Sequence, residues 1–221
     1  ANFKLKFLFQ IIIAKILIDQ GFVISNYYGF FGFENVPWII AQMTTIFVYI
    51  LIVNSINFID GIDGLAITEA LKVILLIEFF SENQTDLFSI GIIVILSFLS
   101  LYYFNFRKNN KIFLGDGGSL FLGTLISIYI FHVLGYSFTF QKELKINKTF
   151  FCIIIMSYPL LDLLRVFLIR ISKGKSPFSP DKNHIHHRIL ENKGHTVKLI
   201  FIQLTHLIFI SIIFFLTKYC F

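Results

Sequence analysis

Apolar runs of about twenty residues recur along the whole chain, and this feature constrains the fold more than any other. A helix needs roughly 20 mostly apolar residues to cross a bilayer. Of the 221 residues, 56% are hydrophobic and 14% are charged, whereas about a quarter of a soluble domain is charged. We therefore predict an all-α, polytopic membrane protein that forms a single membrane domain over residues 1–221.

Seven transmembrane helices are expected from these runs. The third and fifth runs are short, which predicts tilted helices or helices shielded by their neighbours. The expected spans cover residues 5–24, 38–56, 65–80, 87–106, 119–134, 149–170 and 199–217.

Basic residues in the loops predict the orientation of the spans. They are concentrated on the side that holds the N-terminus and the loops near 57–64, 107–118 and 171–198. Because such residues favour the cytoplasmic side, we expect these three loops to be cytoplasmic, in a multi-pass protein of the inner (plasma) membrane. The net charge of +6 suits anionic headgroups or phosphates in the bilayer, and we expect no nucleic-acid partner.

The first of these loops has the sequence Asn57-Phe-Ile-Asp-Gly-Ile-Asp-Gly-Leu-Ala66. It places two carboxylates, Asp60 and Asp63, and two glycines within ten residues. Glycine is a poor helix former, so stability alone gives no reason for this repeat. Because Gly64 precedes the third span, the positive end of that helix is expected to face the loop.

The second loop reads Phe113-Leu-Gly-Asp-Gly-Gly-Ser119 and leads directly into the fifth span. Ser119 is a plausible N-cap, and the glycines allow backbone N–H groups to turn toward an anion. The carboxylates of Asp60, Asp63 and Asp116 would repel a phosphate unless a cation intervened. A hard divalent ion held by one or two carboxylates and by substrate phosphates resolves this conflict.

The third loop, residues 176–188, contains three histidines and ends at Arg188. Two prolines keep its start extended. If the part from Asn183 is helical, His184 and His187 share a face near the arginine. Imidazole and basic groups can donate hydrogen bonds to phosphate oxygens, so an anionic substrate is expected here.

Structural roles are the simplest alternatives for these side chains. The first loop could be a polar turn, Asp116 a helix cap, and the loop histidines solvated. His132, His195 and His206 are expected to be structural. Glu69 and Lys72 are three residues apart, and pairing on the helix surface accounts for them.

The three loops, in this order, resemble those of the polyprenyl-phosphate N-acetylhexosamine-1-phosphate transferases of glycosyl transferase family 4. The first is similar to Asn-Leu-x-Asp-Gly-x-Asp-Gly-Leu-Ala and the second to Phe-Met/Leu-Gly-Asp-x-Gly-Ser. Pro180-Asp-Lys-Asn-His-Ile-His-His187 is similar to the Pro-Asp-x-x-His-x-His-His motif of the N-acetylglucosamine branch. The related phospho-N-acetylmuramoyl-pentapeptide transferases carry three consecutive histidines there instead.

This resemblance implies transfer of an N-acetylhexosamine-1-phosphate, here N-acetylglucosamine-1-phosphate, from a UDP-sugar to polyprenyl (undecaprenyl) phosphate. UMP would be released and Mg²⁺ required, with Mn²⁺ as an alternative. The reaction begins lipid-linked cell-envelope glycans such as O-antigen or teichoic acid. It also implies residue roles: Asp116 as metal ligand, Phe113 near the uracil, and the remaining catalytic or substrate-binding contacts from Asn57, Asp60, Asp63, Asn105, His184, His186, His187 and Arg188.

Two features depart from the family pattern. Members carry an earlier Asp-Asp motif and about three further spans, so this chain resembles the C-terminal portion and Asp19 is no replacement for the pair. We expect the 221-residue chain alone to be inactive, and a non-catalytic remnant is an alternative. Residues 105–111 also replace a segment that usually has a proline and one residue fewer.

Other function classes fit the sequence less well. A transporter would be expected to bind its substrate near mid-bilayer, whereas the polar motifs here lie at one interface. A CDP-alcohol phosphotransferase needs Asp-Gly-x-x-Ala-Arg, and the segment from Asp63 to Thr68 has no arginine. The oligomeric state is left open, with a homodimer as one alternative.

Overall fold

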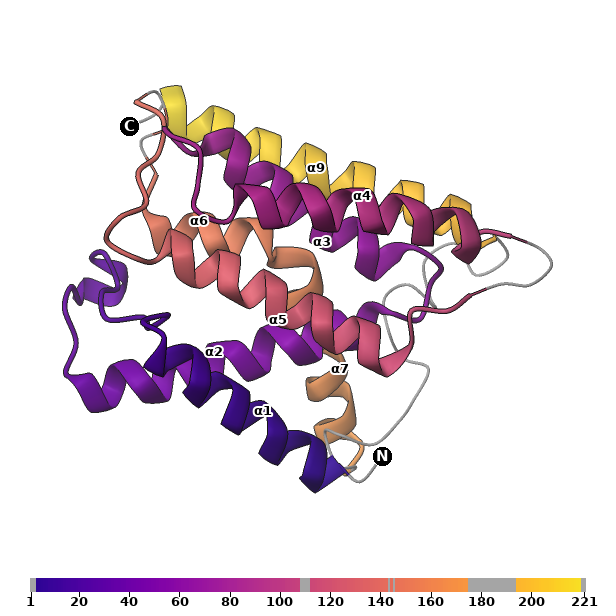
Figure 1. Cartoon of the computed structure of the whole chain (residues 1–221), viewed down its shortest axis with the longest axis horizontal. Helices are drawn as coiled ribbons and strands as arrows, with labels where there is room; N and C mark the ends of the chain where they lie inside the picture. The colour runs from indigo at the N-terminus through magenta and orange to yellow at the C-terminus, as the bar shows by residue number, and fades with distance from the viewer. Residues whose placement is uncertain (1–2, 108–111, 143, 145, 175–193, 220–221) are drawn as a thin grey trace.

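The structure is a computed structural model in which the chain forms a bundle of helices (Figure 1). It describes residues 3–107, 112–142, 144, 146–174 and 194–219. Within them the only β pairing consists of two isolated bridges, which confirms the all-α prediction. The helices are α1 (Phe3–Asp19), the 3₁₀ turn η1 (Phe30–Gly32), α2 (Trp38–Ile59), α3 (Leu65–Phe80), α4 (Phe88–Asn105), α5 (Gly115–Val133), α6 (Lys148–Ile155), α7 (Ser157–Ser172) and α9 (His195–Tyr219).

The chain is a multi-pass membrane protein, but its described part has fewer full spans than the seven expected. Four helices, α2, α4, α5 and α9, are long and apolar enough to cross a membrane, and α6 with α7 makes a fifth if the bent pair is one span. The remaining two expected spans are α1 and α3, with 17 and 16 residues. At about 1.5 Å per residue they reach roughly 25 Å, short of a hydrocarbon core of about 30 Å.

The expected span 149–170 is a broken helix. Its two parts, α6 and α7, meet at Met156 and are bent by 70°. Pro159 lies in the first turn of α7, where a missing N–H is tolerated, and its ring obstructs the carbonyl four residues earlier, at Ile155. This explains why α6 ends at Ile155 and why α7 leaves the bundle at a different angle (Figure 1).

Helix α2 organises the packing, since it contacts α1, α5, α7 and α3. It lies against α5 at Gly123, where an added Cβ would lie 2.7 Å from the Val53 Cα atom. Small residues allow such close approach between membrane helices. Helix α3 packs on α5 on the side away from α1, and α4 and α9 pack on α3 (Figure 1). The outer faces expose large apolar side chains, such as Ile93 and Leu96 of α4, as expected against lipid.

Candidate functional site

Four helix ends meet at one end of the bundle around a cavity of about 330 Å³. They are the C-terminal ends of α2 and α4 and the N-terminal ends of α3 and α5, with the start of α9 beside them. The first two motif loops therefore lie together, as the sequence predicts. Six predicted site residues line this cavity: Asn57, Asp60, Asp63, Asn105, Phe113 and Asp116.

The third predicted group cannot be placed. His184, His186, His187 and Arg188 lie outside the described residues. Their roles, like those of the six residues that line the cavity, remain predictions.

Gly64 gives the first loop its shape. Its φ is +75°, in the left-handed region, and it directly precedes α3 as expected. A Cβ there would also lie 2.8 Å from the Phe106 ring. Both the positive φ and the lack of room for a Cβ therefore require glycine at position 64. The turn at Gly64 ends the loop in which Asp60 and Asp63 face the same cavity.

The electrostatics of the cavity are dominated by carboxylates. Burial, followed by the charges of Asp116 and Asp63, raises the pKa of Asp60 to about 7. An anionic substrate would add to this repulsion, whereas a bound cation would relieve it.

A metal ion would have to be held by few protein ligands. The described residues contain no group of three or more His, Cys, Asp or Glu side chains arranged to hold one. Mg²⁺ commonly takes only one or two carboxylates and completes its shell with water and substrate phosphate. Asp116 and Asp60 are close enough for the charge of Asp116 to raise the pKa of Asp60. One or two carboxylates at this place fit a Mg²⁺ ion bound in that way.

Helix α5 begins earlier than expected, which changes the role of Ser119. The predicted N-cap at Ser119 is wrong: the helix starts at Gly115, whose φ of +66° turns the chain into it. Asp116 consequently lies in the first turn, where the helix dipole stabilises a negative charge. The Ser119 hydroxyl instead accepts a hydrogen bond from the side-chain Nδ2 of Asn57 (2.7 Å).

Lys6 is a residue that the sequence reasoning missed. Its ammonium donates to Oδ1 of Asn57 (2.8 Å), while Nδ2 of Asn57 donates to Oδ1 of Asp116 (3.3 Å). Asn57 thus bridges the lysine of α1 and the carboxylate of α5. A lysine at the start of an apolar run looks like a topology-determining charge, so only the packing of α1 on α2 indicates its place at the site.

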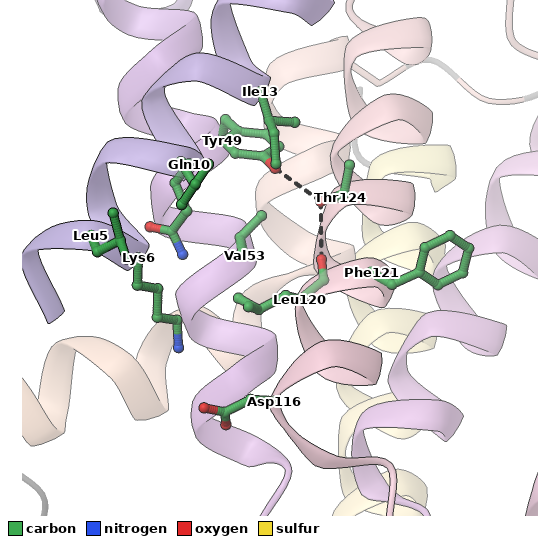
Figure 2. A pocket seen from close by; sticks show the side chains of 11 residues that line it. Leu5, Lys6, Gln10, Ile13, Tyr49, Val53, Asp116, Leu120, Phe121 and Thr124 are labelled. Atoms are coloured by element: carbon green, nitrogen blue, oxygen red, sulfur yellow. Dashed lines mark hydrogen bonds between the residues drawn. The ribbon is translucent and has the colours of Figure 1, made fainter. Parts of the chain in front are cut away.

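A second cavity, a groove of about 580 Å³, runs along α1, α2 and α5 and shares Asp116 with the first. Figure 2 shows Lys6 and Asp116 at the same end of this groove. Apolar side chains such as Val53 and Leu120 line its length, and the Tyr49 hydroxyl is hydrogen-bonded to that of Thr124 (2.9 Å). The groove therefore has an apolar body and a charged end.

Asn105 and Phe113 complete the wall of the site cavity. Asn105 is buried and donates from Nδ2 to the backbone oxygen of Ile112 (2.8 Å), while its Oδ1 has no hydrogen-bond partner in the described part of the chain. Phe113 is 69% exposed at the rim. An exposed ring beside a polar cavity is suited to stacking on a planar ligand.

Two expectations about charged and histidine residues need correction. Glu69 and Lys72 do form a pair, but both are buried rather than on a helix surface, and His206 and Gln203 of α9 join them. His206 is structural, as expected. His195, which was expected to be structural like His206, instead lines the site cavity, and no local pattern distinguishes the two.

Comparison with known proteins decides the family. Residues 1–134, which include the first two motif loops, match the model of glycosyl transferase family 4. The chain belongs to glycosyl transferase family 4.

The relatives within this family are consistent in their names. The chain is 33% identical to a probable undecaprenyl-phosphate N-acetylglucosaminyl 1-phosphate transferase of Bacillus subtilis, over 93% of this chain and 57% of that protein. It is 32% identical to a decaprenyl-phosphate N-acetylglucosaminephosphotransferase of Mycobacterium leprae (84% and 51%). It is 27% identical to an undecaprenyl-phosphate alpha-N-acetylglucosaminyl 1-phosphate transferase of Escherichia coli (87% and 52%). The chain spans about half the length of these relatives.

Proposed function

We propose that this family 4 protein transfers N-acetylglucosamine-1-phosphate from UDP-N-acetylglucosamine to a polyprenyl phosphate and releases UMP. One observation carries the proposal: five residues from two separate motifs, together with Asn105, line a single cavity, which adjoins an apolar groove. The names of the relatives supply the acceptor class and the transferred group.

The cavity has the groups that a nucleotide diphosphate needs. The N-terminal ends of α3 and α5 direct backbone N–H groups toward it, and such ends bind phosphate. Phe113 at the rim would stack on the uracil. Asp116 would hold Mg²⁺, with Mn²⁺ as an alternative, and when bound the ion would neutralise the diphosphate beside the carboxylates.

The groove suits a lipid phosphate acceptor. A polyprenyl phosphate has a long apolar chain and an anionic head, and the groove has apolar walls with Lys6 at its charged end. With its phosphate near Lys6, the acceptor would reach the donor across Asp116. An acceptor oxygen attacks the β-phosphorus of the UDP-sugar, the bond to the bridging oxygen breaks, and UMP leaves. Catalysis is then mostly positioning and charge stabilisation.

The orientation follows from the loop charges. We place the site at the cytoplasmic face of the inner (plasma) membrane, where UDP-sugars are available. A non-catalytic remnant of the family is the alternative, and no contact in the described residues favours it.

The test is Asp116→Asn in the protein expressed from its complete gene. We expect the variant to lose Mg²⁺-dependent UMP release from UDP-N-acetylglucosamine in the presence of undecaprenyl phosphate. Asp19→Asn is the matched control, because it makes the same charge change at an exposed residue of α1 that pairs with Lys15. Near-normal turnover in Asp116→Asn would refute the metal assignment, and no turnover in the unsubstituted protein would refute the proposed function.

A further inference from the structure

The first residue of α9 connects the C-terminal helix to the site. Nδ1 of His195 lies 2.9 Å from Oδ2 of Asp63, the second carboxylate of the first motif. The His195 side chain is 50% exposed, whereas that of Asp63 is only 14% exposed. The imidazole therefore contacts a largely buried carboxylate from the open side of the cavity.

The fold fixes this contact from deeper in the bundle. Gln203 of α9 donates to Oε1 of Glu69 in α3 (3.0 Å), and His206 Nδ1 lies 2.6 Å from the Lys72 ammonium. These α9 residues lie eight and eleven positions beyond His195, or about 12 and 17 Å along the helix. All four side chains are buried. Since they set the register of α9 on α3, the position of His195 over Asp63 is set as well.

The break between α6 and α7 is tied to the same cluster. The Ser157 hydroxyl, at the first residue of α7, is hydrogen-bonded to Nε2 of His206 (2.8 Å). Each ring nitrogen of His206 thus contacts a different helix, α3 through Lys72 and α7 through Ser157. This arrangement limits both sliding and rotation of α9. It therefore also restricts where His195, at the exposed end of the helix, can lie relative to Asp63.

Chemistry determines the direction of the hydrogen bond. The Asp63 carboxylate can only accept, so Nδ1 of His195 must carry the proton. Asp63 lies near Asp60, whose pKa its charge helps to raise, and a diphosphate in the cavity would repel both. The hydrogen bond from His195 opposes rotation of the Asp63 carboxylate away from the cavity.

We propose that His195 is a positioning residue that orients the Asp63 carboxylate for binding of the donor substrate. This inference rests on the proposed transferase function. An isolated exposed histidine–carboxylate pair would be worth little, but this carboxylate is only 14% exposed and its donor is placed by the packing of α9. Partners of this kind change activity by about 10- to 100-fold in comparable metal sites.

The test compares His195→Ala, His195→Asn and His195→Gln in the protein expressed from its complete gene. The amide nitrogen of Asn occupies about the place of Nδ1, and that of Gln about the place of Nε2. We expect about tenfold lower kcat/KM for UDP-N-acetylglucosamine in His195→Ala, with an unchanged melting temperature. His195→Asn should recover most of the loss and His195→Gln should not. Thr196→Ala, exposed on the same helical turn, is the control and should match the unsubstituted protein.

The outcomes separate the two proposals. An active unsubstituted protein with His195→Ala within twofold of it overturns the role of His195 and leaves the transferase function standing. Recovery by Gln rather than Asn, or by neither, also overturns it, because the Nδ1 hydrogen bond would not be the cause. If the unsubstituted protein releases no UMP, it is the transferase function that fails.

Discussion

The close approach of α2 and α5 should be sensitive to a single methyl group at Gly123. In Gly123→Ala the new Cβ would lie 2.7 Å from the Val53 Cα atom and 3.3 Å from its carbonyl oxygen. Ordinary contacts begin near 3.4 Å, so the two helices must separate by about 0.7 Å (3.4 − 2.7). Backbone atoms cannot rotate away, and overpacking of this kind costs about 1–3 kcal/mol.

The same displacement should reach the site. Ser119 and Asn57 each lie four residues, about one turn, from this contact in the direction of the cavity. A shift of about 0.7 Å would lengthen their 2.7 Å hydrogen bond to about 3.4 Å, beyond the usual limit of about 3.2 Å. We therefore expect lower UMP release as well as lower stability from a residue outside the cavity.

Thermal unfolding in detergent provides the primary assay. About 0–2 kcal/mol remains after the better helix propensity of alanine is subtracted, and this corresponds to a drop of up to roughly 8 °C. Gly118→Ala is the matched control, because the atoms nearest its added Cβ belong to the side chain of Leu114, which can rotate, and not to backbone. If Gly123→Ala melts at or above the temperature of Gly118→Ala, the argument from backbone contact is wrong.

Two further predictions concern buried charge. The pKa of Asp60 is about 7 in the folded state against an ordinary value of 3.8. Because the folded state holds this proton more tightly, the contribution of Asp60 to stability falls as pH rises from about 4 to 7. Asp60→Asn should remove that part of the pH dependence of the melting temperature, and an unchanged slope would contradict this prediction. Glu69→Gln should leave the Lys72 charge buried without its carboxylate and lower the free energy of unfolding by about 3–5 kcal/mol. Adding Lys72→Met should recover most of that loss in the same thermal assay, and failure to recover would show that charge is not the cause.

Local patterns in the sequence predicted the helices and much of the site. The length of an apolar run determines whether a helix can form in a membrane, so the helical class and most helix positions follow from sequence alone. That Asp60 and Asp116 lie at the same cavity was also predictable, because glycine beside a carboxylate at a helix end is a chemical pattern within a few residues. The break at Pro159 could have been found in the same way, since the rule that explains it is local.

Only the tertiary structure decided which distant residues share an environment. Lys6 and His195 reach the site because α1 packs on α2 and α9 packs on α3. No local sequence pattern predicts either of these packing contacts. The Glu69 and Lys72 pair looks the same in sequence whether it faces lipid, water or another helix, and only the packing of α9 shows that it is buried. Side-chain chemistry and helix periodicity act over a few residues, whereas burial and charge proximity depend on how whole helices are arranged.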